Sequence, residues 1–342
     1  MSEIKDRNYA VDLIRVVAFC FVVLVHFFYR TEYYNTVFNN VGMAVLTFFR
    51  NTAMSCVPLF IMLTGYLMSK KTLNKEYYRG IIRTLLIFAL VEACCIIYDL
   101  NVFVSTFKEL FFAIGSNHYS WYIDMYVGLF LIIPFLNLAY NGLQTKKQKQ
   151  VLVLTFFVIC LLFANISGIF KQSQGYWKVA YPLAYYFVGC YIREFPPKQK
   201  AYRYILIGIS STIILVGLLY LMNRNRVIKG SALTDYNSIF IYITSISIFS
   251  AILQTQNALN KRALAKTILP KISRLTLGAY LISYITDDIV YETLYAYVPN
   301  ETTQFYYLPL TVAVSIIASL CLSYFINLIS DGILHTVKFK KA

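Results

Sequence analysis

Apolar runs about 20 residues long recur along the whole chain and constrain its fold more than any other feature. A helix needs about 20 mostly apolar residues to cross a bilayer. Ten runs reach or approach that length, at 9–29, 42–68, 79–98, 120–141, 150–168, 178–194, 203–222, 237–254, 273–293 and 306–330. The sequence therefore predicts an all-α polytopic membrane protein with about ten transmembrane helices. A shorter apolar segment, 103–114, is expected to lie at the membrane surface or to re-enter the membrane.

The composition agrees with a membrane protein and excludes several other classes. Apolar residues make up 58% of the 342 positions, whereas soluble domains average roughly 45–50%. Glycine and proline are scarce, so collagen-like and low-complexity chains are excluded. No hydrophilic stretch is long enough for a soluble catalytic module. We therefore expect a single transmembrane domain over 1–342 with no fused soluble domain.

The basic residues predict how the helices are oriented. The formal charge is +15, from 31 basic and 16 acidic side chains. If the N-terminus is cytoplasmic, 22 basic residues fall on the cytoplasmic side. The 8 on the outer side are Arg30, Arg50, Lys108, Lys171, Lys178, Arg224, Arg226 and Lys229. This asymmetry follows the positive-inside rule. It predicts a multi-pass protein of the plasma membrane with both termini in the cytoplasm. The positive charge is then explained by the orientation of the helices and does not indicate nucleic-acid binding.

The first predicted span contains three ionisable side chains, which are costly inside a membrane and are functional candidates for that reason. Asp12 and Arg15 are three residues apart and can pair on one helix face. In one interpretation, Arg15 only extends to the headgroups with Asp12 as its counter-ion. Arg15 and His26 are eleven residues apart, which is three helical turns plus roughly 20°, or about 16.5 Å along the axis. They therefore share a face suited to the wall of an internal cavity.

Histidine and arginine suit complementary tasks on that face. Histidine suits general-base catalysis because its ordinary pKa lies near neutrality, and arginine suits phosphate because its forked donors stay charged. A long anionic cofactor that enters from the cytoplasm is expected to anchor its phosphates near Arg15 and to extend its reactive end towards His26. The alternative for His26 is an interfacial histidine bonded to a neighbour.

Basic residues gather again where the third span begins, in the segment KEYYRGIIRTLL. Arg79 and Arg83 are four residues apart and lie on one face where the third span begins. With Lys70 and Lys71 they form a predicted basic cluster at the cytoplasmic mouth of the cavity. Topology alone also explains these charges, but Arg83 already lies within the apolar run, which favours an anion-binding site.

Polar and aromatic residues crowd the outer end of the fourth span, where we predict substrate binding. They are His118, Trp121, Tyr122 and Asp124. An aromatic belt at the membrane surface explains the tryptophan and the tyrosine, but not Asp124 or His118. Asp287 and Asp288 end the ninth span, where they are expected to face water. The cysteines and histidines show no metal-ligand spacing, so no metal site is predicted.

Four segments at these spacings resemble one known family. Arg15 and His26 match a motif of a basic residue, ten residues and a histidine. The other three segments are VPLFIMLTGYLMSKK, which ends in a Ser/Thr-Gly-aromatic-Leu turn, the arginine-bearing YYRGIIRTLL, and SWYIDMYVGLFLIIPFLN, which resembles a tryptophan-containing fourth-helix motif. In this order they resemble the acyltransferase-3 family of integral membrane O-acyltransferases, over essentially the whole chain.

The resemblance implies transfer of an acetyl group from cytoplasmic acetyl-CoA to a hydroxyl of a cell-surface or lipid-linked glycan. It implies His26 as the essential catalytic residue, with Arg15, Arg79 and Arg83 on the CoA-binding side. Asp12 is expected to orient a basic partner. A succinyl or other short acyl group fits the same phosphate anchor. His26 acts either as a base toward the acceptor hydroxyl or as a transient acyl carrier, and the residues do not decide between them.

The sequence departs from the family at one position, and the same residues are also compatible with two other functions. Many members have a histidine where this chain has Ser283, so no role of that histidine transfers. A transporter or flippase for a lipid-linked saccharide or an acylated intermediate would use the basic cavity without chemistry, and would tolerate replacement of His26. A membrane sensor or scaffold would make the shared face a coincidence. The expected partners of the acyltransferase are acyl-CoA, the glycan acceptor, the lipid bilayer and other polysaccharide-assembly proteins.

Overall fold

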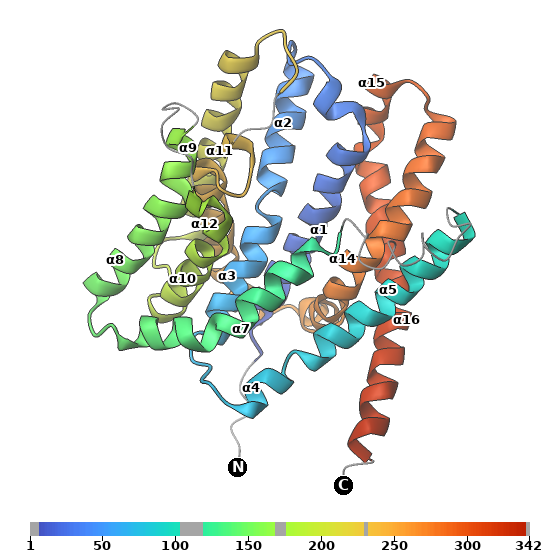
Figure 1. Cartoon of the computed structure of the whole chain (residues 1–342). Helices are drawn as coiled ribbons and strands as arrows, with labels where there is room; N and C mark the ends of the chain where they lie inside the picture. The colour runs from blue at the N-terminus through green and yellow to red at the C-terminus, as the bar shows by residue number, and fades with distance from the viewer. Residues whose placement is uncertain (1–6, 103–118, 168–175, 229–231, 340–342) are drawn as a thin grey trace. The chain divides into compact units, whose positions relative to one another are not determined.

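The computed structural model describes residues 7–102, 119–167, 176–228 and 232–339. Every named element in those ranges is a helix, as Figure 1 shows. The one strand-like pairing among the described residues is an isolated bridge between Val37 and Val227. The prediction of an all-α chain is therefore confirmed for these ranges. The segment 103–114, predicted to lie at the membrane surface, falls outside the described residues.

Seven helical stretches in the described ranges are long and apolar enough to cross a membrane. They are α1 (Tyr9–Arg30), α2 with α3 (Val41–Ala53 and Cys56–Met68), α4 with α5 (Lys75–Arg79 and Ile82–Val102), α7 (Trp121–Gly142), α8 with α9 (Lys146–Phe157 and Phe163–Ser167), α11 (Ala201–Asn223) and α16 (Leu308–Phe339). A π-helical turn, Val158–Leu162, joins α8 to α9. These stretches correspond to seven of the ten predicted spans.

The other three predicted spans are also helical, but they differ in length or composition. The helices α10 (Tyr181–Glu194) and α12 (Ile239–Leu253) have 14 and 15 residues. At 1.5 Å per residue they are about 21–23 Å long, shorter than the roughly 30 Å hydrocarbon core. Helix α14 (Ala263–Tyr297) has 35 residues, but charged residues such as Arg274 and Asp287 interrupt its apolar stretch. The count of ten spans and the cytoplasmic termini stay predictions.

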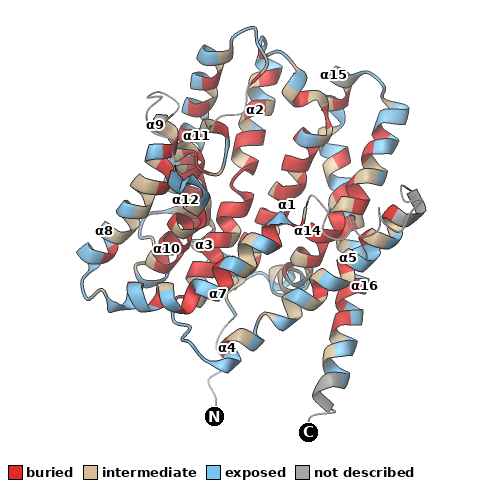
Figure 2. Cartoon of the chain, in the orientation of Figure 1, coloured by how far each residue is buried: buried red, intermediate tan, exposed pale blue. Residues whose placement is uncertain are grey.

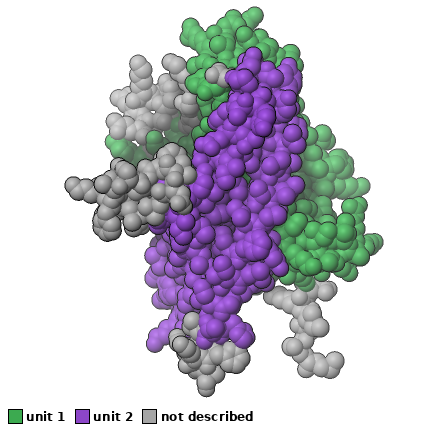
Figure 3. Space-filling model, turned by 90° about the vertical axis from the view of Figure 1, so that its right-hand side faces the viewer, with its two compact units in different colours: residues 1–70, 137–273 green, residues 71–136, 274–342 purple. Residues whose placement is uncertain are grey.

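The chain divides into two compact units, which Figure 3 distinguishes by colour. Unit 1 contains residues 1–70 and 137–273, and unit 2 contains residues 71–136 and 274–342. Two of the boundaries fall inside helices, in α7 and in α14. Short helices connect the longer ones: η1 (Glu32–Asn35), η3 (Tyr176–Ala180), η4 (Ala232–Thr234), α13 (Gln256–Leu259), α15 (Glu301–Gln304) and η5 (Phe305–Tyr307).

The packing of α3 against α10 in unit 1 depends on two glycines. A Cβ atom at Gly65 would lie 2.1 Å from the carbonyl oxygen of Tyr186, and one at Gly189 would lie 2.0 Å from that of Met62. Neither position has room for a side chain, so the two backbones approach as closely as small residues allow. Figure 2 shows buried residues running along both helices and along α1.

Hydroxyl groups hold α11 to α12 in the same unit. The Oγ1 atoms of Thr212 and Thr244 are 3.2 Å apart, and Ser211 Oγ donates to the carbonyl of Phe240 at 3.0 Å. Such bonds are common between apolar helices, because neighbouring side chains rather than water satisfy their polar groups. Unit 1 therefore combines close backbone contact with interhelical hydrogen bonds.

Hydrogen bonds also join the helices of unit 2. Ser323 Oγ of α16 donates to the carbonyl of Leu275 in α14 at 2.7 Å. In α4, the ring of Tyr77 stacks on that of Phe130 with 4.4 Å between centroids. The Tyr77 hydroxyl also donates to the Phe130 carbonyl, which ties α4 to α7. Polar contacts thus set the positions of α4, α7, α14 and α16 within this unit.

Candidate active site

Helix α1 is uninterrupted from Tyr9 to Arg30, which confirms the predicted placement of Arg15 and His26 on one helix. The Asn8 side chain caps the helix by accepting a hydrogen bond from the Val11 N–H at 3.2 Å. His26 is buried, whereas the Arg15 side chain is partly exposed. A buried imidazole and a partly exposed cation therefore lie about three turns apart on α1.

Two arginines hold Asp12 near the start of α1. Arg7 donates to both carboxylate oxygens, with Nε 2.7 Å from Oδ2 and Nη2 3.2 Å from Oδ1. Arg15 Nη1 lies 3.2 Å from Asp12 Oδ1 and 3.3 Å from Ser273 Oγ. The predicted pair of Asp12 and Arg15 is confirmed, but Arg7 is the closer partner. The hydrogen bond to Asp12 raises the pKa of Arg7, so this guanidinium group stays charged. The Asp12 carboxylate is therefore paired with two permanent cations.

Aromatic packing fixes the end of α1 that carries His26. The ring of Phe28 meets those of Phe27 and Tyr33 edge to face, with 5.7 and 4.9 Å between centroids. Tyr33 is buried and donates to Thr47 Oγ1 at 3.0 Å. Burial raises the pKa of Tyr33 to about 12, so its hydroxyl stays protonated and keeps this bond at neutral pH. The helix end beside His26 is therefore anchored to α2.

A turn at Gly80 and Ile81 separates Arg79 from Arg83, so the two do not lie on one continuous helix and their shared face stays a prediction. Arg79 is the last residue of α4, and Arg83 lies in the first turn of α5. Between them, the Gly80 N–H donates to the carbonyl of Tyr77, three residues back rather than four. Glycine favours such a break because it weakens a helix interior by about 1 kcal/mol relative to alanine. Arg79 is exposed, whereas Arg83 is partly buried.

Arg83 belongs to a polar cluster of unit 2 that includes a second arginine. Its Nη2 donates to Asn327 Oδ1 at 2.8 Å and lies 3.4 Å from Asp331 Oδ1. Arg274 Nη2 donates to the other oxygen of Asp331. Arg83 Nε is buried and has no hydrogen-bond partner among the described residues. Two partly exposed guanidinium groups thus share one carboxylate, which leaves a positive charge for an anion. The predicted cluster members Lys70 and Lys71 are exposed.

The residues predicted at the outer end of the fourth span lie at the start of α7 in unit 2. Tyr122 is buried, and its ring meets that of Tyr280 in α14 with 5.7 Å between centroids. Trp121 and Asp124 are exposed. His118 falls outside the described residues. The structure therefore places Tyr122 against α14, and Trp121 and Asp124 on the surface.

Unit 2 also contains a cluster of tyrosines that donate to aspartates. The pairs are Tyr98 with Asp288 at 2.8 Å, Tyr284 with Asp99 at 3.3 Å and Tyr119 with Asp287 at 3.1 Å. The prediction that Asp287 and Asp288 face water is wrong for Asp287, which is fully buried. A tyrosine hydroxyl replaces water as its donor, which a buried carboxylate requires.

Ser283 stands one turn before Asp287, at the position where the resemblance leads one to expect a histidine in many related proteins. It is fully buried, and its Oγ donates to the carbonyl of Tyr280 at 2.7 Å. The hydroxyl is therefore engaged with its own helix. This position provides no acid–base group of the imidazole type.

A known protein family matches almost the whole chain. Residues 8–328 match the family model Acyl_transf_3, described as an acyltransferase domain. The chain belongs to the acyltransferase-3 family. The match spans both units and every residue predicted for the site. No curated protein and no solved structure matches the chain. Membership of this family, together with the seven long apolar helices, makes the protein a membrane acyltransferase.

Sequence patterns did not single out all the polar residues of this acyltransferase. Arg274, Asn327 and Asp331 form the Arg83 cluster, yet in the sequence Arg274 is only one of the 22 basic residues on the predicted cytoplasmic side. One signal was present, because Asn327 and Asp331 are four residues apart and so share a face of α16. A polar pair on the last apolar helix is a reason to search for a partner on another helix.

Arg50 is a second residue whose role in the acyltransferase differs from the prediction. It was assigned to an outer loop, but it lies in α2 and is buried. It donates to Tyr34 Oη at 3.0 Å, to Asn51 Oδ1 at 2.9 Å and to the Thr234 carbonyl at 2.5 Å. Arg50 therefore ties the chain before α12 to α2. The signal was its position inside the apolar run 42–68.

Proposed function

We propose that this acyltransferase moves an acetyl, or another short acyl, group from acyl-CoA to a hydroxyl of a cell-surface or lipid-linked glycan. The observation that carries the proposal is α1, where one unbroken helix in the family-matching segment holds a buried His26 about 16.5 Å along the axis from Arg15. A general base and a phosphate anchor at that separation suit a donor with a long arm between its phosphates and its thioester. We place the donor on the cytoplasmic side, together with both termini.

His26 is the proposed catalytic residue. Its imidazole accepts the proton of the acceptor hydroxyl while that oxygen attacks the thioester carbonyl carbon. The new C–O bond forms, the C–S bond breaks, and the proton passes from the imidazole to the departing sulfur, so that the products are the ester and free CoA. In the alternative sequence the acyl group moves first to His26 and then to the hydroxyl.

The Arg83 cluster of unit 2 is the proposed site for the donor phosphates. Its support is the net positive charge of Arg83 and Arg274 beside a single, partly exposed aspartate. Guanidinium groups bind phosphate oxygens through paired, charge-assisted hydrogen bonds. Arg79 and Lys71 of the same unit are proposed as further members of this cation set. Arg15 and Lys70 of unit 1 are proposed separately as contacts of the donor, with Asp12 positioning Arg15.

The exposed residues at the start of α7 are the proposed contacts of the acceptor. Trp121 offers an exposed aromatic ring to a sugar, and Asp124 offers an exposed carboxylate to its hydroxyl groups. Tyr122 supports them by packing against α14. His118 is proposed as a further contact from its position in the sequence.

The test is transfer of labelled acetyl groups from acetyl-CoA to glycan acceptors by purified protein in liposomes. We expect His26→Ala to lower the rate by about 10²–10⁴-fold, the usual contribution of a general base. His335→Ala is the matched control, because His335 is exposed near the end of α16. Full transfer by the His26 variant would remove His26 from the proposal.

The same preparation separates the enzyme from a transporter. No binding of acetyl-CoA by the unmodified protein would favour a transporter or flippase. Acetyl label that stays on the denatured protein, and is lost in the His26 variant, would indicate a covalent intermediate. Label found only on the acceptor would support direct transfer.

A further inference from the structure

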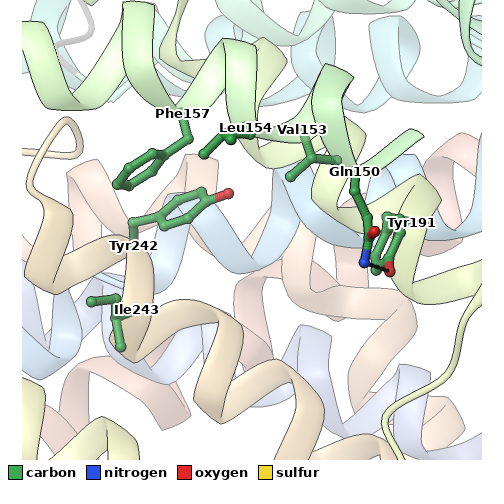
Figure 4. A pocket seen from close by; sticks show the side chains of 7 residues that line it. All are labelled: Gln150, Val153, Leu154, Phe157, Tyr191, Tyr242 and Ile243. Atoms are coloured by element: carbon green, nitrogen blue, oxygen red, sulfur yellow. Dashed lines mark hydrogen bonds between the residues drawn. The ribbon is translucent and has the colours of Figure 1, made fainter. Parts of the chain in front are cut away.

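An open groove runs along one face of α8 in unit 1, and its lining residues belong to none of the sites described above. It has a volume of about 370 Å³. Its lining includes Gln150, Val153, Leu154 and Phe157 of α8, Tyr191 of α10 and Tyr242 of α12, as Figure 4 shows. The wall is mostly apolar, and it lies within a stretch long and apolar enough to cross a membrane.

The groove changes in polarity along α8. Lys146 and Lys147 precede Gln150 by four and three residues, and Phe157 follows it by seven, so these side chains recur on one helix face. From Lys147 to Phe157 the axis rises about 15 Å. The order along this face is cation, amide, aliphatic and aromatic, which resembles the order of polarity along a phospholipid from its headgroup to its chains.

Positive charge at the lysine-bearing end of the groove is not neutralised by the protein. Lys146 and Lys147 are exposed and form no ion pair among the described residues. The neighbouring Lys149 is different, because its Nζ lies 2.7 Å from Glu194 Oε2 and over the ring of Tyr140. Two of the three lysines are therefore available to an anionic headgroup.

Tyr242 places an unsatisfied donor in the groove. Only 7% of this residue is exposed, and Figure 4 shows its hydroxyl directed into the groove. The hydroxyl has no hydrogen-bond partner among the described residues. The rest of the side chain is buried, and the hydroxyl opens onto an apolar groove. Where lipid rather than water fills such a groove, a donor without a partner is costly, so the occupant is expected to supply an acceptor. The polar pair nearer the lysines, Gln150 and Tyr191, is already joined by a hydrogen bond of 3.0 Å.

We propose that this groove binds a phospholipid with an anionic headgroup. Its phosphate lies at Lys146 and Lys147, one acyl chain covers Val153 and Phe157, and an ester carbonyl accepts from Tyr242. A zwitterionic phospholipid lacks the net charge that the lysines match, and an isoprenoid lipid lacks the ester carbonyl. The proposal rests on unit 1 alone and is independent of the proposed acyl transfer.

The test is native mass spectrometry of the purified full chain with equal amounts of phosphatidylglycerol and phosphatidylcholine. We expect about thirtyfold greater retention of phosphatidylglycerol, because each of the two lysines near an anionic lipid contributes about 1 kcal/mol. Val153→Trp fills the groove and should lower that retention about tenfold. Val151→Trp is the matched control, because Val151 lies on the same helix, is 61% exposed and does not line the groove.

Two milder variants keep the proposal testable if a tryptophan in the groove disturbs folding. Replacing both exposed lysines, K146Q with K147Q, should remove the preference between the two lipids. Tyr242→Phe keeps the ring packed on Phe157, whose centroid is 5.3 Å away, and should weaken retention of both lipids about threefold. Equal retention of both lipids by the unmodified protein, equal effects of tryptophan at 151 and 153, or a co-purified isoprenoid lipid in the groove would each overturn the proposal.

Discussion

Each unit of the molecule places two arginines around one aspartate, and the two clusters differ in the burial of the carboxylate. In unit 1, Asp12 is 2% exposed, and both of its oxygens accept hydrogen bonds from guanidinium groups. In unit 2, the side chain of Asp331 is 39% exposed between Arg83 and Arg274. Both clusters contain two arginines and one aspartate, but the aspartate is buried in unit 1 and accessible to solvent in unit 2.

The burial of the carboxylate decides whether a ligand can replace it beside its arginines. Removing a buried carboxylate that is fully paired leaves cations without a counter-ion, so Asp12 is expected to hold the start of α1 in place. An exposed ion pair contributes little, because water competes for both groups. A phosphate with more charge and more acceptors can displace Asp331 from its arginines. We therefore expect Asp12 to stay paired and to position Arg15 in unit 1, and Asp331 to be displaced by a ligand in unit 2.

Replacement of either aspartate should affect stability, and much more strongly for Asp12 than for Asp331. Asp12→Ala should lower the free energy of unfolding by about 3 kcal/mol, near the lower end for a broken buried pair because both arginines are partly exposed. Asp331→Ala should lower it by at most about 1 kcal/mol. Denaturant titration of both variants in the same detergent provides the measurement. Equal losses in the two variants would show that burial does not distinguish the clusters.

The unit 1 cluster could be predicted from the sequence because its central pair is local. The predicted span 9–29 agrees with Tyr9–Arg30 almost to the residue, since a long apolar run and an asparagine cap define one helix. Asp12 and Arg15 share one turn, so spacing alone was enough to pair them. Arg7 lies outside the apolar run, and no spacing indicated that it would be the closer partner.

A second prediction tests whether the unit 2 cluster binds the donor. Arg83→Ala should raise the KM for acetyl-CoA about 10–100-fold with a smaller change in kcat, because a hydrogen bond to a charged group contributes about 1.5–3 kcal/mol. Arg262→Ala is the matched control, because Arg262 is exposed and belongs to neither cluster. Steady-state kinetics of both variants provides the comparison. A fall in kcat at an unchanged KM would contradict a role in donor binding.

The unit 2 cluster could not be predicted from the sequence because its residues come from distant parts of the chain. Arg274 and Asp331 are separated by 57 positions and lie on different helices, so no local period relates them. The spacing of Arg79 and Arg83 also gave no sign that the helix is interrupted at Gly80 between them. The burial of Asp287 was missed for the same reason as the cluster, since its donor Tyr119 is 168 positions away.

A third prediction concerns a small improvement in donor binding, opposite in direction to the effect of Arg83→Ala. Asp331→Asn removes the carboxylate that competes with the donor for Arg83 and Arg274. The KM for acetyl-CoA should therefore fall about two- to threefold, the change expected for an exposed ion pair of about 0.5 kcal/mol. Asp12→Asn should not lower the KM, because Asp12 is expected to position Arg15 rather than to compete for the ligand. The measurement is KM at low ionic strength and again at about 0.5 M salt, where screening should remove most of the gain. A higher KM in the Asp331 variant would show that this carboxylate positions the two arginines, as Asp12 does in unit 1, and the two clusters would then be alike.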